Sequence, residues 1–383
     1  MPASYREVDA KSVSRTSRGV DPWFIAQFGM NLYRGCEHGC HYCDGRAEKY
    51  RVEGDFSRDI VVKRNAPAVL ARELARLREP GFVLLGGGVC DAYQPAEARF
   101  RLARQALELV VRHDLPVHVL TKSALIERDF DLLDLIQSKR RTILSFSIQT
   151  VDDRVREHFE PGAASIDERF RLLQDAKKRG YATGIMAMPV LPGISDRPDA
   201  IDALFARAAD VGVDFVLCGG LTLRPGSQME AFLSSLERYD PGMLDGYRRL
   251  YRDGRRSGTG DARYYARLER RFQSARRQYQ MPGRMPRHLF RGLIPLYSEV
   301  AVLLEHEAFA RSCEGRPARH LEEACWSLQQ WSRARLAKDR RLLAHELERE
   351  LLSMLDDGSV RSLPNMTGDA VEVIRRIVAE IAR

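Results

Sequence analysis

The sequence lacks any run of hydrophobic residues long enough to cross a membrane. A transmembrane helix needs about 20 consecutive apolar residues, and no segment of the 383-residue chain approaches that length. Residues 1–20 contain arginine and serine but no apolar centre of the kind found in a secretory signal peptide. We therefore expect a cytoplasmic protein that does not enter a membrane.

Cysteine is scarce outside one short segment. Three of the seven cysteines lie within residues 36–43, and the other four, Cys90, Cys218, Cys313 and Cys325, are isolated. A secreted disulfide framework would instead show several cysteines at regular spacings in a short chain. The sequence also lacks internal repeats, and its length suits one large α/β domain or two smaller domains.

Positive charge is concentrated in one segment. The chain has a formal net charge of +8, but residues 248–291 contain fourteen arginines, no lysine and three acidic residues. That segment has a net charge of +11, which leaves −3 for the rest of the chain. Aromatic residues are interleaved with the arginines. Guanidinium groups pair with phosphates and aromatic rings stack on bases, so the segment suits a nucleic acid. The alternative is a solvated helix in an arginine-rich protein.

Short apolar runs alternate with longer amphipathic runs between residues 23 and 217. This alternation is typical of βα units and predicts a parallel sheet. We predict strands over 23–32, 82–85, 117–120, 142–148, 183–188 and 213–217, and helices over 96–112, 123–138, 166–179 and 198–211. The fold class favoured by this pattern is α/β, a partial (β/α)6 TIM-like barrel, and a doubly wound sheet is the alternative.

Beyond about residue 224 the alternation stops and the pattern becomes helical. We predict helices over 294–306, 318–337, 341–355 and 370–382. The expected organisation is a polar lead over 1–27, the partial barrel over 28–226 and a helical, arginine-rich C-terminal domain over 227–383.

Cys36, Cys40 and Cys43 form the most informative motif, with the spacing CxxxCxxC. Thiolates at this spacing bind zinc or an iron-sulfur cluster. A structural zinc site needs a fourth ligand, and no second cysteine pair follows, although His38 or His41 could complete the set. Three protein ligands leave one metal position open for chemistry. We therefore favour a cluster over zinc and over three unliganded thiols.

The segment from Asn31 to Cys43, with an aromatic residue before the last cysteine, resembles the signature of radical S-adenosylmethionine (SAM) enzymes. More narrowly, the chain is similar to the spore photoproduct lyase-like subgroup, also described as DNA repair photolyase-like, over about residues 30–224. The other motifs that carry this likeness are Thr121-Lys122-Ser123, Ser145-Phe146-Ser147-Ile148, Phe159-Glu160-Pro161-Gly162 and Arg169.

The resemblance implies a 4Fe-4S cluster with three irons held by Cys36, Cys40 and Cys43 and the fourth bound by SAM. One electron from a flavodoxin or ferredoxin type reductant would cleave SAM to a 5′-deoxyadenosyl radical, which abstracts a hydrogen atom from the substrate. The resemblance also implies residues that contact SAM. These are Tyr42 near the adenine, Gly86, Gly87 and Gly88 beside the methionine, and Lys122 and Ser147 at polar groups.

Each of these residues also has a plainer interpretation. Glycines after a strand often only form a turn. Lys122 could be a solvated side chain, and Ser147 could face a polar barrel interior. Glu160 could brace Arg169 as a structural ion pair.

The sequence differs from the subgroup at the residue that serves there as hydrogen donor. Spore photoproduct lyase uses a cysteine after the second strand, and in this sequence Gly88 stands at that position with Cys90 two residues later. The tyrosine that follows the last cluster cysteine in the subgroup is Asp44 here. Cys90 is the candidate catalytic thiol, because residues i and i+2 of an extended segment point the same way. An ordinary buried thiol is the alternative.

Taken with the arginine-rich segment, the resemblance predicts a radical SAM enzyme of lyase or transferase type that acts on a damaged or modified base in nucleic acid. A radical SAM enzyme acting on a peptide or small metabolite is the first alternative. The alternative from another class is a metal-dependent nucleic-acid-binding protein without catalytic activity.

Overall fold

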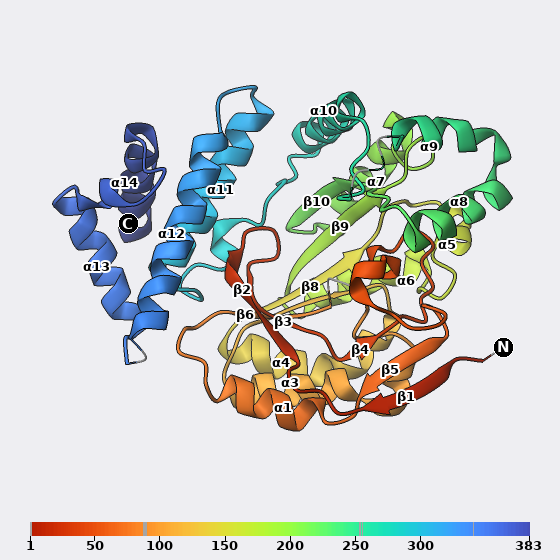
Figure 1. Cartoon of the computed structure of the whole chain (residues 1–383), viewed down its shortest axis with the longest axis horizontal. Coiled ribbons are helices and arrows are strands. Elements are labelled where there is room, and N and C mark those ends of the chain that lie inside the picture. Colours follow the sequence, from red (N-terminus) through yellow and green to blue (C-terminus); the bar gives the residue numbers. More distant parts are fainter. Residues whose placement is uncertain (1, 87–89, 253, 255, 340) are drawn as a thin grey trace.

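Seven strands form one curled sheet in the order β10-β9-β8-β7-β6-β3-β2 (Figure 1). The structure is a computed structural model that describes residues 2–86, 90–252, 254, 256–339 and 341–383. Six strands are parallel, and β2 pairs antiparallel with β3 at one edge. The strands are β2 (Ser14–Asp21), β3 (Ala26–Met30), β6 (Phe82–Leu85), β7 (Val117–Thr121), β8 (Thr142–Ser147), β9 (Ala182–Val190) and β10 (Phe215–Gly220). The predicted partial barrel with six parallel strands is confirmed.

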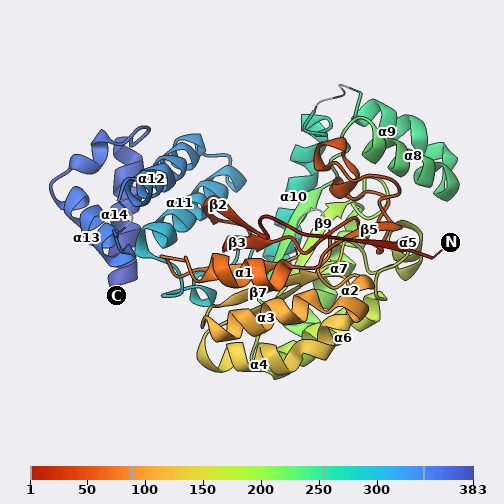
Figure 2. The ribbon, with the colours of Figure 1, turned by 60° about the horizontal axis from the view of Figure 1, so that its bottom comes forward.

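Helices follow the parallel strands, and most of them cover the outer face of the sheet (Figure 2). A capping box fixes the start of the helix Ile166–Lys178. The side chains of Ser165 and Glu168 each accept a hydrogen bond from the backbone N–H of the other residue. All six residues of β8 are buried, as expected for a strand covered on both faces. The helices are α1 (Ala66–Leu74), α2 (Ala96–Phe100), α3 (Leu102–Arg112), α4 (Phe130–Lys139), α5 (Asp153–Phe159), α6 (Ile166–Lys178) and α7 (Pro198–Val211), with the 3-10 helix η3 (Ala124–Asp129) before α4.

A second, three-stranded sheet has the order β1-β5-β4 and consists of β1 (Ser4–Val8), β5 (Asp59–Lys63) and β4 (Tyr33–Arg34). Strand β1 is parallel to β5, and β4 is antiparallel to it. The sequence analysis treats residues 1–27 as a polar lead, yet β1 and β2 lie within this range. The polar side chains of β1 are largely exposed, so the strand shows no apolar pattern in the sequence.

The chain after residue 227 is helical and forms two groups. Helices α8 (Ser227–Tyr239), α9 (Leu244–Leu250) and α10 (Ala262–Gln278) pack on the barrel. Helices α11 (Leu296–Cys313), α12 (Arg319–Lys338), α13 (Ala344–Asp356) and α14 (Gly368–Ala382) share a hydrophobic core of their own. The 3-10 helices are η1 (Asp44–Arg46), η2 (Glu48–Tyr50), η4 (Pro241–Met243), η5 (Arg287–Leu289) and η6 (Ser359–Ser362).

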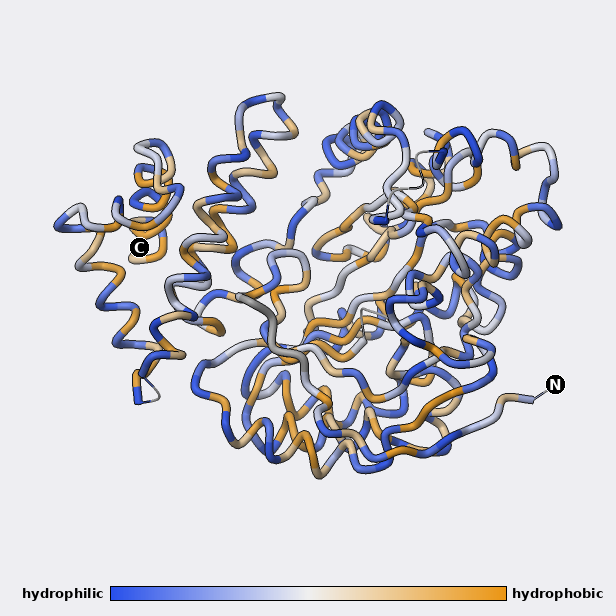
Figure 3. The backbone as a smooth tube through the Cα atoms, in the orientation of Figure 1, coloured by the Kyte–Doolittle hydropathy of each residue, from blue (hydrophilic) through white to orange (hydrophobic). Residues whose placement is uncertain are grey.

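Hydrophobic residues follow the central strands and alternate with polar residues along the surrounding helices (Figure 3). The helices therefore pack on the sheet through one face each. Within the described parts of the chain, no helix has the length and apolar character that crossing a membrane requires.

Strand β10 ends the sheet opposite β2, and later parts of the chain cover its free edge. The Val216 N–H donates to the carbonyl of Pro282, and α10 packs beside β10 in the main core. The chain then contributes to the core inside the barrel through Met285, Phe290 and Ile294. The concave side of the partial barrel is thus filled in part by the segment that leads to α11.

Candidate active site

The three motif cysteines lie on one loop between β4 and η1. Gly35 and Gly39 in this loop have φ values of +79° and +64°, a conformation that glycine adopts without strain. The Gly39 N–H donates to the Cys36 carbonyl at 3.1 Å, and the Cys43 N–H donates to the Cys40 carbonyl at 3.3 Å. The loop folds back on itself, and all three cysteines line one cavity.

Arg46 supports the cysteine loop. Its guanidinium donates to the carbonyls of Gly39 and Cys40 at 3.0 and 2.9 Å and to the Ser57 hydroxyl at 2.8 Å. The guanidinium carbon also lies 4.8 Å from the ring centre of Phe56. Arg46 therefore supplies a donor to the Gly39 carbonyl and a second donor to the Cys40 carbonyl, which also accepts from the Cys43 N–H.

Burial controls the chemistry of the three thiols. It raises the pKa of Cys36 and Cys43, and it raises the pKa of Cys40 to about 12. Metal binding requires thiolates, so iron would displace protons from these groups. No three His, Cys, Asp or Glu side chains of the described residues converge on a point that would hold a single metal ion. The cysteines of a cluster bind different irons, so the donor set fits a cluster.

The cavity has a volume of about 540 Å³ and lies where the parallel strands end at their carboxyl side. Such strand ends meet at one rim of a barrel, where side chains from different strands can face the same space. The predicted site residues that line the cavity are Cys36, Cys40, Tyr42, Cys43, Cys90, Lys122 and Ser147.

Lys122 and Ser147 are in direct contact. Ser147 ends β8, Lys122 directly follows β7, and the Lys122 Nζ donates to the Ser147 hydroxyl. The same Nζ lies 3.9 Å from the Glu160 carboxylate and 5.9 Å from the ring centre of Tyr42. The Tyr42 hydroxyl donates to Glu160. The structure thus brings four polar side chains together beside the cysteine loop.

Glu160 is fully buried, and its carboxylate lies 2.7 Å from the guanidinium of Arg169. Arg169 is also fully buried and donates to the carbonyls of Ser147 and Ala164 at 2.8 and 2.9 Å. Burial alone would raise the pKa of Glu160, but Arg169 and Lys122 hold this pKa below its usual value. The structural ion pair considered in the sequence analysis is therefore present, and it fixes a carboxylate beside Lys122.

A second buried carboxylate, Asp91, connects the loop after β6 with the cysteine loop. It accepts hydrogen bonds from the Thr121 hydroxyl and the Lys122 N–H, both at 2.8 Å, and lies 3.2 Å from His38 Nε2. His38 Nδ1 lies 2.8 Å from the Gly162 carbonyl. Burial would raise the pKa of Asp91, but the nearby imidazole lowers it. No local sequence pattern marks Asp91, and His38 is expected from the sequence only as a candidate zinc ligand.

The local backbone requires glycine at position 86, the first residue of the glycine triplet after β6. Gly86 has a φ of +92°, and a Cβ there would lie 1.9 Å from the Leu120 carbonyl oxygen, so a side chain does not fit. Gly86 is not among the described residues that line the cavity, and its contact with SAM stays a prediction. The predicted contacts of Gly87 and Gly88 lie outside the described residues.

Cys90 lines the cavity, with its Sγ 3.3 Å from Asn31 Oδ1 and 3.2 Å from the Tyr33 carbonyl. Burial raises the pKa of Cys90 to about 12, so the thiol keeps its hydrogen at neutral pH. Cys218 instead packs in the outer core between β10 and α10. Of these two cysteines, Cys90 is the one that lines the cavity.

Asp44, which replaces the tyrosine of the subgroup, joins the cysteine loop to the segment before α8. Arg224 Nε donates to its carboxylate at 2.6 Å, and the Tyr50 hydroxyl donates at 2.9 Å. Gln228 donates to the Tyr42 carbonyl at 2.9 Å. The sequence analysis misses Arg224 and Gln228, because hydrogen bonds between such distant segments leave no local pattern.

Comparison with known proteins places this site in a family. The sequence matches the Radical SAM superfamily over residues 30–205. An uncharacterized protein of Mycobacterium tuberculosis is 31% identical over 232 residues, which cover 60% of this chain and 68% of that protein. A Radical SAM Nalpha-GlyT isomerase of Pseudomonas phage M6 is 26% identical over 212 residues, which cover 55% of this chain and 42% of that protein.

Among solved structures, a spore photoproduct lyase mutant with bound AdoMet and dinucleoside spore photoproduct is similar in fold. Its TM-score is 0.51 at 20% identity, and the match covers 70% of this chain and 78% of the lyase chain. The predicted resemblance to radical SAM enzymes is confirmed. The chain belongs to the radical SAM superfamily and has the fold of spore photoproduct lyase.

Proposed function

We propose that this protein is a radical SAM enzyme that cleaves SAM reductively and abstracts a hydrogen atom from a damaged or modified base in nucleic acid. The observation that carries this proposal is that three cysteines, Lys122 and Ser147 all line one cavity at the barrel rim. When bound, a 4Fe-4S cluster and SAM supply a 5′-deoxyadenosyl radical, and the protein supplies binding, orientation and exclusion of water.

The residues of the rim have separate tasks in this proposal. Cys36, Cys40 and Cys43 would hold three irons and leave the fourth for SAM. Lys122 and Ser147 would bind the polar groups of SAM, with Tyr42 near the adenine. The buried ion pair between Glu160 and Arg169 would keep these side chains in place, because Glu160 contacts Lys122 and Tyr42 while Arg169 donates to the Ser147 carbonyl.

The thiol of Cys90 would be the hydrogen donor in this proposal, after turning from its contacts with Asn31 Oδ1 and the Tyr33 carbonyl. An electron for SAM cleavage would come from a flavodoxin or ferredoxin type reductant.

The proposed substrate class has support from similar proteins. The spore photoproduct lyase structure contains a dinucleoside photoproduct, and the related phage protein carries the name Nalpha-GlyT isomerase. The match to the lyase concerns the fold, so the substrate of this chain is a proposal.

A row of arginines on α10 is a second support. Arg263, Arg267, Arg270 and Arg277 are exposed, and their spacing keeps them on one face of the helix. This α10 arginine row is about 21 Å long at 1.5 Å per residue. Within the described chain, none of the four side chains forms a salt bridge or a hydrogen bond. Their charges remain free to neutralise phosphates.

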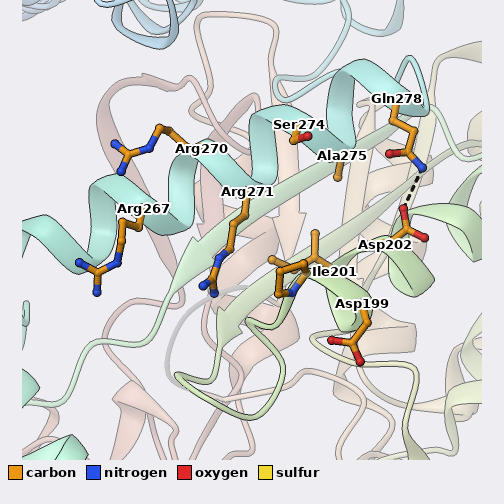
Figure 4. A pocket seen from close by; sticks show the side chains of 10 residues that line it. Asp199, Ile201, Asp202, Arg267, Arg270, Arg271, Ser274, Ala275 and Gln278 are labelled. Carbon is orange, nitrogen blue, oxygen red and sulfur yellow. Dashed lines mark hydrogen bonds between the residues drawn. The ribbon is translucent and has the colours of Figure 1, made fainter.

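The α10 arginine row borders a groove of about 680 Å³ between α7 and α10 (Figure 4). Arg267, Arg270 and Arg271 line one part of this groove, and Asp199 and Asp202 line another. Positive charge therefore gathers at one end of the groove. This end would contact the backbone of a nucleic acid whose base enters the cavity.

Anaerobic reconstitution with iron and sulfide tests the proposal. We expect bound iron and sulfide, 5′-deoxyadenosine formation that depends on reductant, and faster formation with UV-damaged DNA than without it. Tight zinc binding with no SAM cleavage would contradict the enzyme assignment. SAM cleavage that neither DNA nor RNA affects would contradict the substrate class and favour a peptide or a small metabolite.

A further inference from the structure

Two aromatic side chains, Trp23 and Phe24, line the cavity away from the cysteine loop. They lie in the turn between β2 and β3, just before β3 begins at Ala26. The cysteine loop follows β3 and β4, on the other side of β3 in the sequence. The cavity is therefore lined both by the turn before β3 and by the loop after β4.

The wall near the aromatic pair is apolar. Leu120, Met186 and Met188 line the cavity from β7 and β9, and they pack in the same core as Trp23 and Phe24. Met186 is the register partner of Ser147, so this apolar wall adjoins the polar residues at the strand ends. Aromatic rings and thioethers favour contact with flat, polarisable groups. This part of the cavity suits a planar ring that is recognised by stacking.

The turn that carries the two rings is held by hydrogen bonds. Asp21 Oδ1 accepts the N–H groups of Trp23 and Phe24 at 2.8 and 3.0 Å. The Phe24 carbonyl lies 2.9 Å from Nδ1 of the buried His118, whose Nε2 lies 2.9 Å from the Ser145 hydroxyl. The rings are therefore positioned before a ligand arrives, which lowers the entropic cost of binding.

Arg284, in the segment between α10 and α11, links the same turn to α11. The guanidinium carbon of Arg284 lies 4.2 Å from the ring centre of Trp23 and 3.6 Å from that of Phe309. Arg284 also forms an ion pair with Glu305 of α11 at 3.2 Å. The cation is thus sandwiched between an aromatic ring of the cavity wall and one of the C-terminal helices.

We propose that Trp23 and Phe24 form a stacking platform for the target base and that Arg284 positions this platform from the C-terminal helices. The inference rests on the proposed function and adds the element that receives the base. A base must leave its stack to reach an enclosed site, and stacking on these rings compensates for that loss. Aromatic faces accept every base, so the platform selects a flat ring and tolerates sequence variation.

Fluorescence of Trp23 tests the platform directly. The chain has three tryptophans, and replacing Trp326→Phe and Trp331→Phe leaves Trp23 as the only one. The anaerobically reconstituted full-length protein is titrated with a short thymidine oligonucleotide and with an abasic strand of the same length. We expect the thymidine strand to quench Trp23, and we expect the abasic strand to bind through its phosphates without quenching.

Variants separate the platform from the phosphate contacts. Trp23→Leu is expected to weaken binding of the thymidine strand by about 5- to 160-fold, the range for loss of one stacked base, and to leave the affinity for the abasic strand unchanged. Trp23→Phe retains a ring and most of the affinity. Arg284→Met keeps an unbranched side chain without the charge and should reduce the quenching. Trp326→Phe alone is the matched control, because Trp326 is exposed on α12.

The outcomes distinguish the platform from the proposed function. Equal affinity of Trp23→Leu and wild type for the thymidine strand, or binding without quenching, overturns the platform and leaves the proposed function standing. Wild-type protein that binds no nucleic acid overturns both. If Trp23→Leu fails to fold, quenching in the single-tryptophan protein and the affinity of Trp23→Phe decide the question.

Discussion

The two ends of the active-site cavity are built from different chemistry. At the rim, buried thiols and a lysine lie next to a network of paired charges that includes Glu160 and Arg169. At the other end, Trp23 and Phe24 meet leucine and methionine side chains. Charged ligands need partners of opposite sign in a low-dielectric site, whereas a planar ring needs a flat apolar surface. In the two proposals above, the cofactor would therefore lie at the rim and the substrate ring against the apolar wall.

The largest effect is expected at the rim from Cys40→Ala. Loss of one thiolate should prevent stable cluster binding, because in the proposed cluster each cysteine would hold a different iron. Iron content and 5′-deoxyadenosine formation should both fall to background. Cys218→Ala is the matched control, since this cysteine is also buried but packs in the outer core. Retained SAM cleavage in Cys40→Ala would show that the assignment of cluster ligands is wrong.

The next effect concerns the charged network behind the rim. Arg169→Met leaves the Glu160 carboxylate buried without its main partner, and removal of one member of a buried pair typically costs about 3–5 kcal/mol of unfolding free energy. Denaturant unfolding measures this loss. The double variant Glu160→Gln with Arg169→Met should recover part of the stability. An unfolding free energy equal to that of wild type would mean that the pair does not support the rim.

A smaller effect, on stability against pH, is expected from His118 at the apolar end. Burial lowers the pKa of His118 to about 4 from an ordinary value of 6.5. Between these values the unfolded chain binds a proton that the folded chain does not, so unfolding free energy decreases as pH falls, by about 1.4 kcal/mol per pH unit. His118→Gln should remove this part of the slope.

Denaturant unfolding at pH 6.5 and pH 5 compares the two proteins. Burial also lowers the pKa of His41 and His306 to about 4, so the variant keeps their contribution. The relevant quantity is therefore the difference between wild type and His118→Gln. An identical slope in both would show that folding does not lower the pKa of His118.

The smallest effect is expected outside the cavity, on the α10 arginine row. Arg267→Gln with Arg270→Gln should weaken single-stranded DNA binding several-fold and lower the salt dependence of log K by about 1.4, at roughly 0.7 per phosphate contact. Fluorescence anisotropy over a range of salt concentrations measures both. Arg333→Gln with Arg361→Gln removes the same charge from exposed positions in the C-terminal helices and should change neither. An unchanged slope of log K against log salt concentration in the α10 variant would show that the α10 arginine row does not contact nucleic acid.

The sequence predicts the barrel and the rim better than the apolar end. The strands of the partial barrel are visible because each is a short apolar run followed by an amphipathic helix. The cysteine loop is visible because its ligands are only a few residues apart. Lys122 and Ser147 follow from the resemblance to a family, and the structure shows them in contact.

Features that depend on distant segments are not predictable in this way. The sandwich of Trp23, Arg284 and Phe309 joins three parts of the chain, and none of the three has a local pattern that marks it. The arginines of the arginine-rich segment also fall into two groups, paired and solvent-facing, and composition alone does not distinguish them. Arg276 and Arg287 are paired with Glu269 and Glu299, whereas the α10 arginine row faces solvent. The side on which each arginine lies depends on helix packing.

The covered edge of β10 explains how a partial barrel can be stable without closing. A sheet that does not close ends in a strand whose backbone would otherwise template pairing with a strand of another molecule. Here the Val216 N–H is taken by Pro282, and α10 packs alongside. The barrel can therefore stay incomplete while the edge strand that would otherwise pair with another molecule is covered by its own chain.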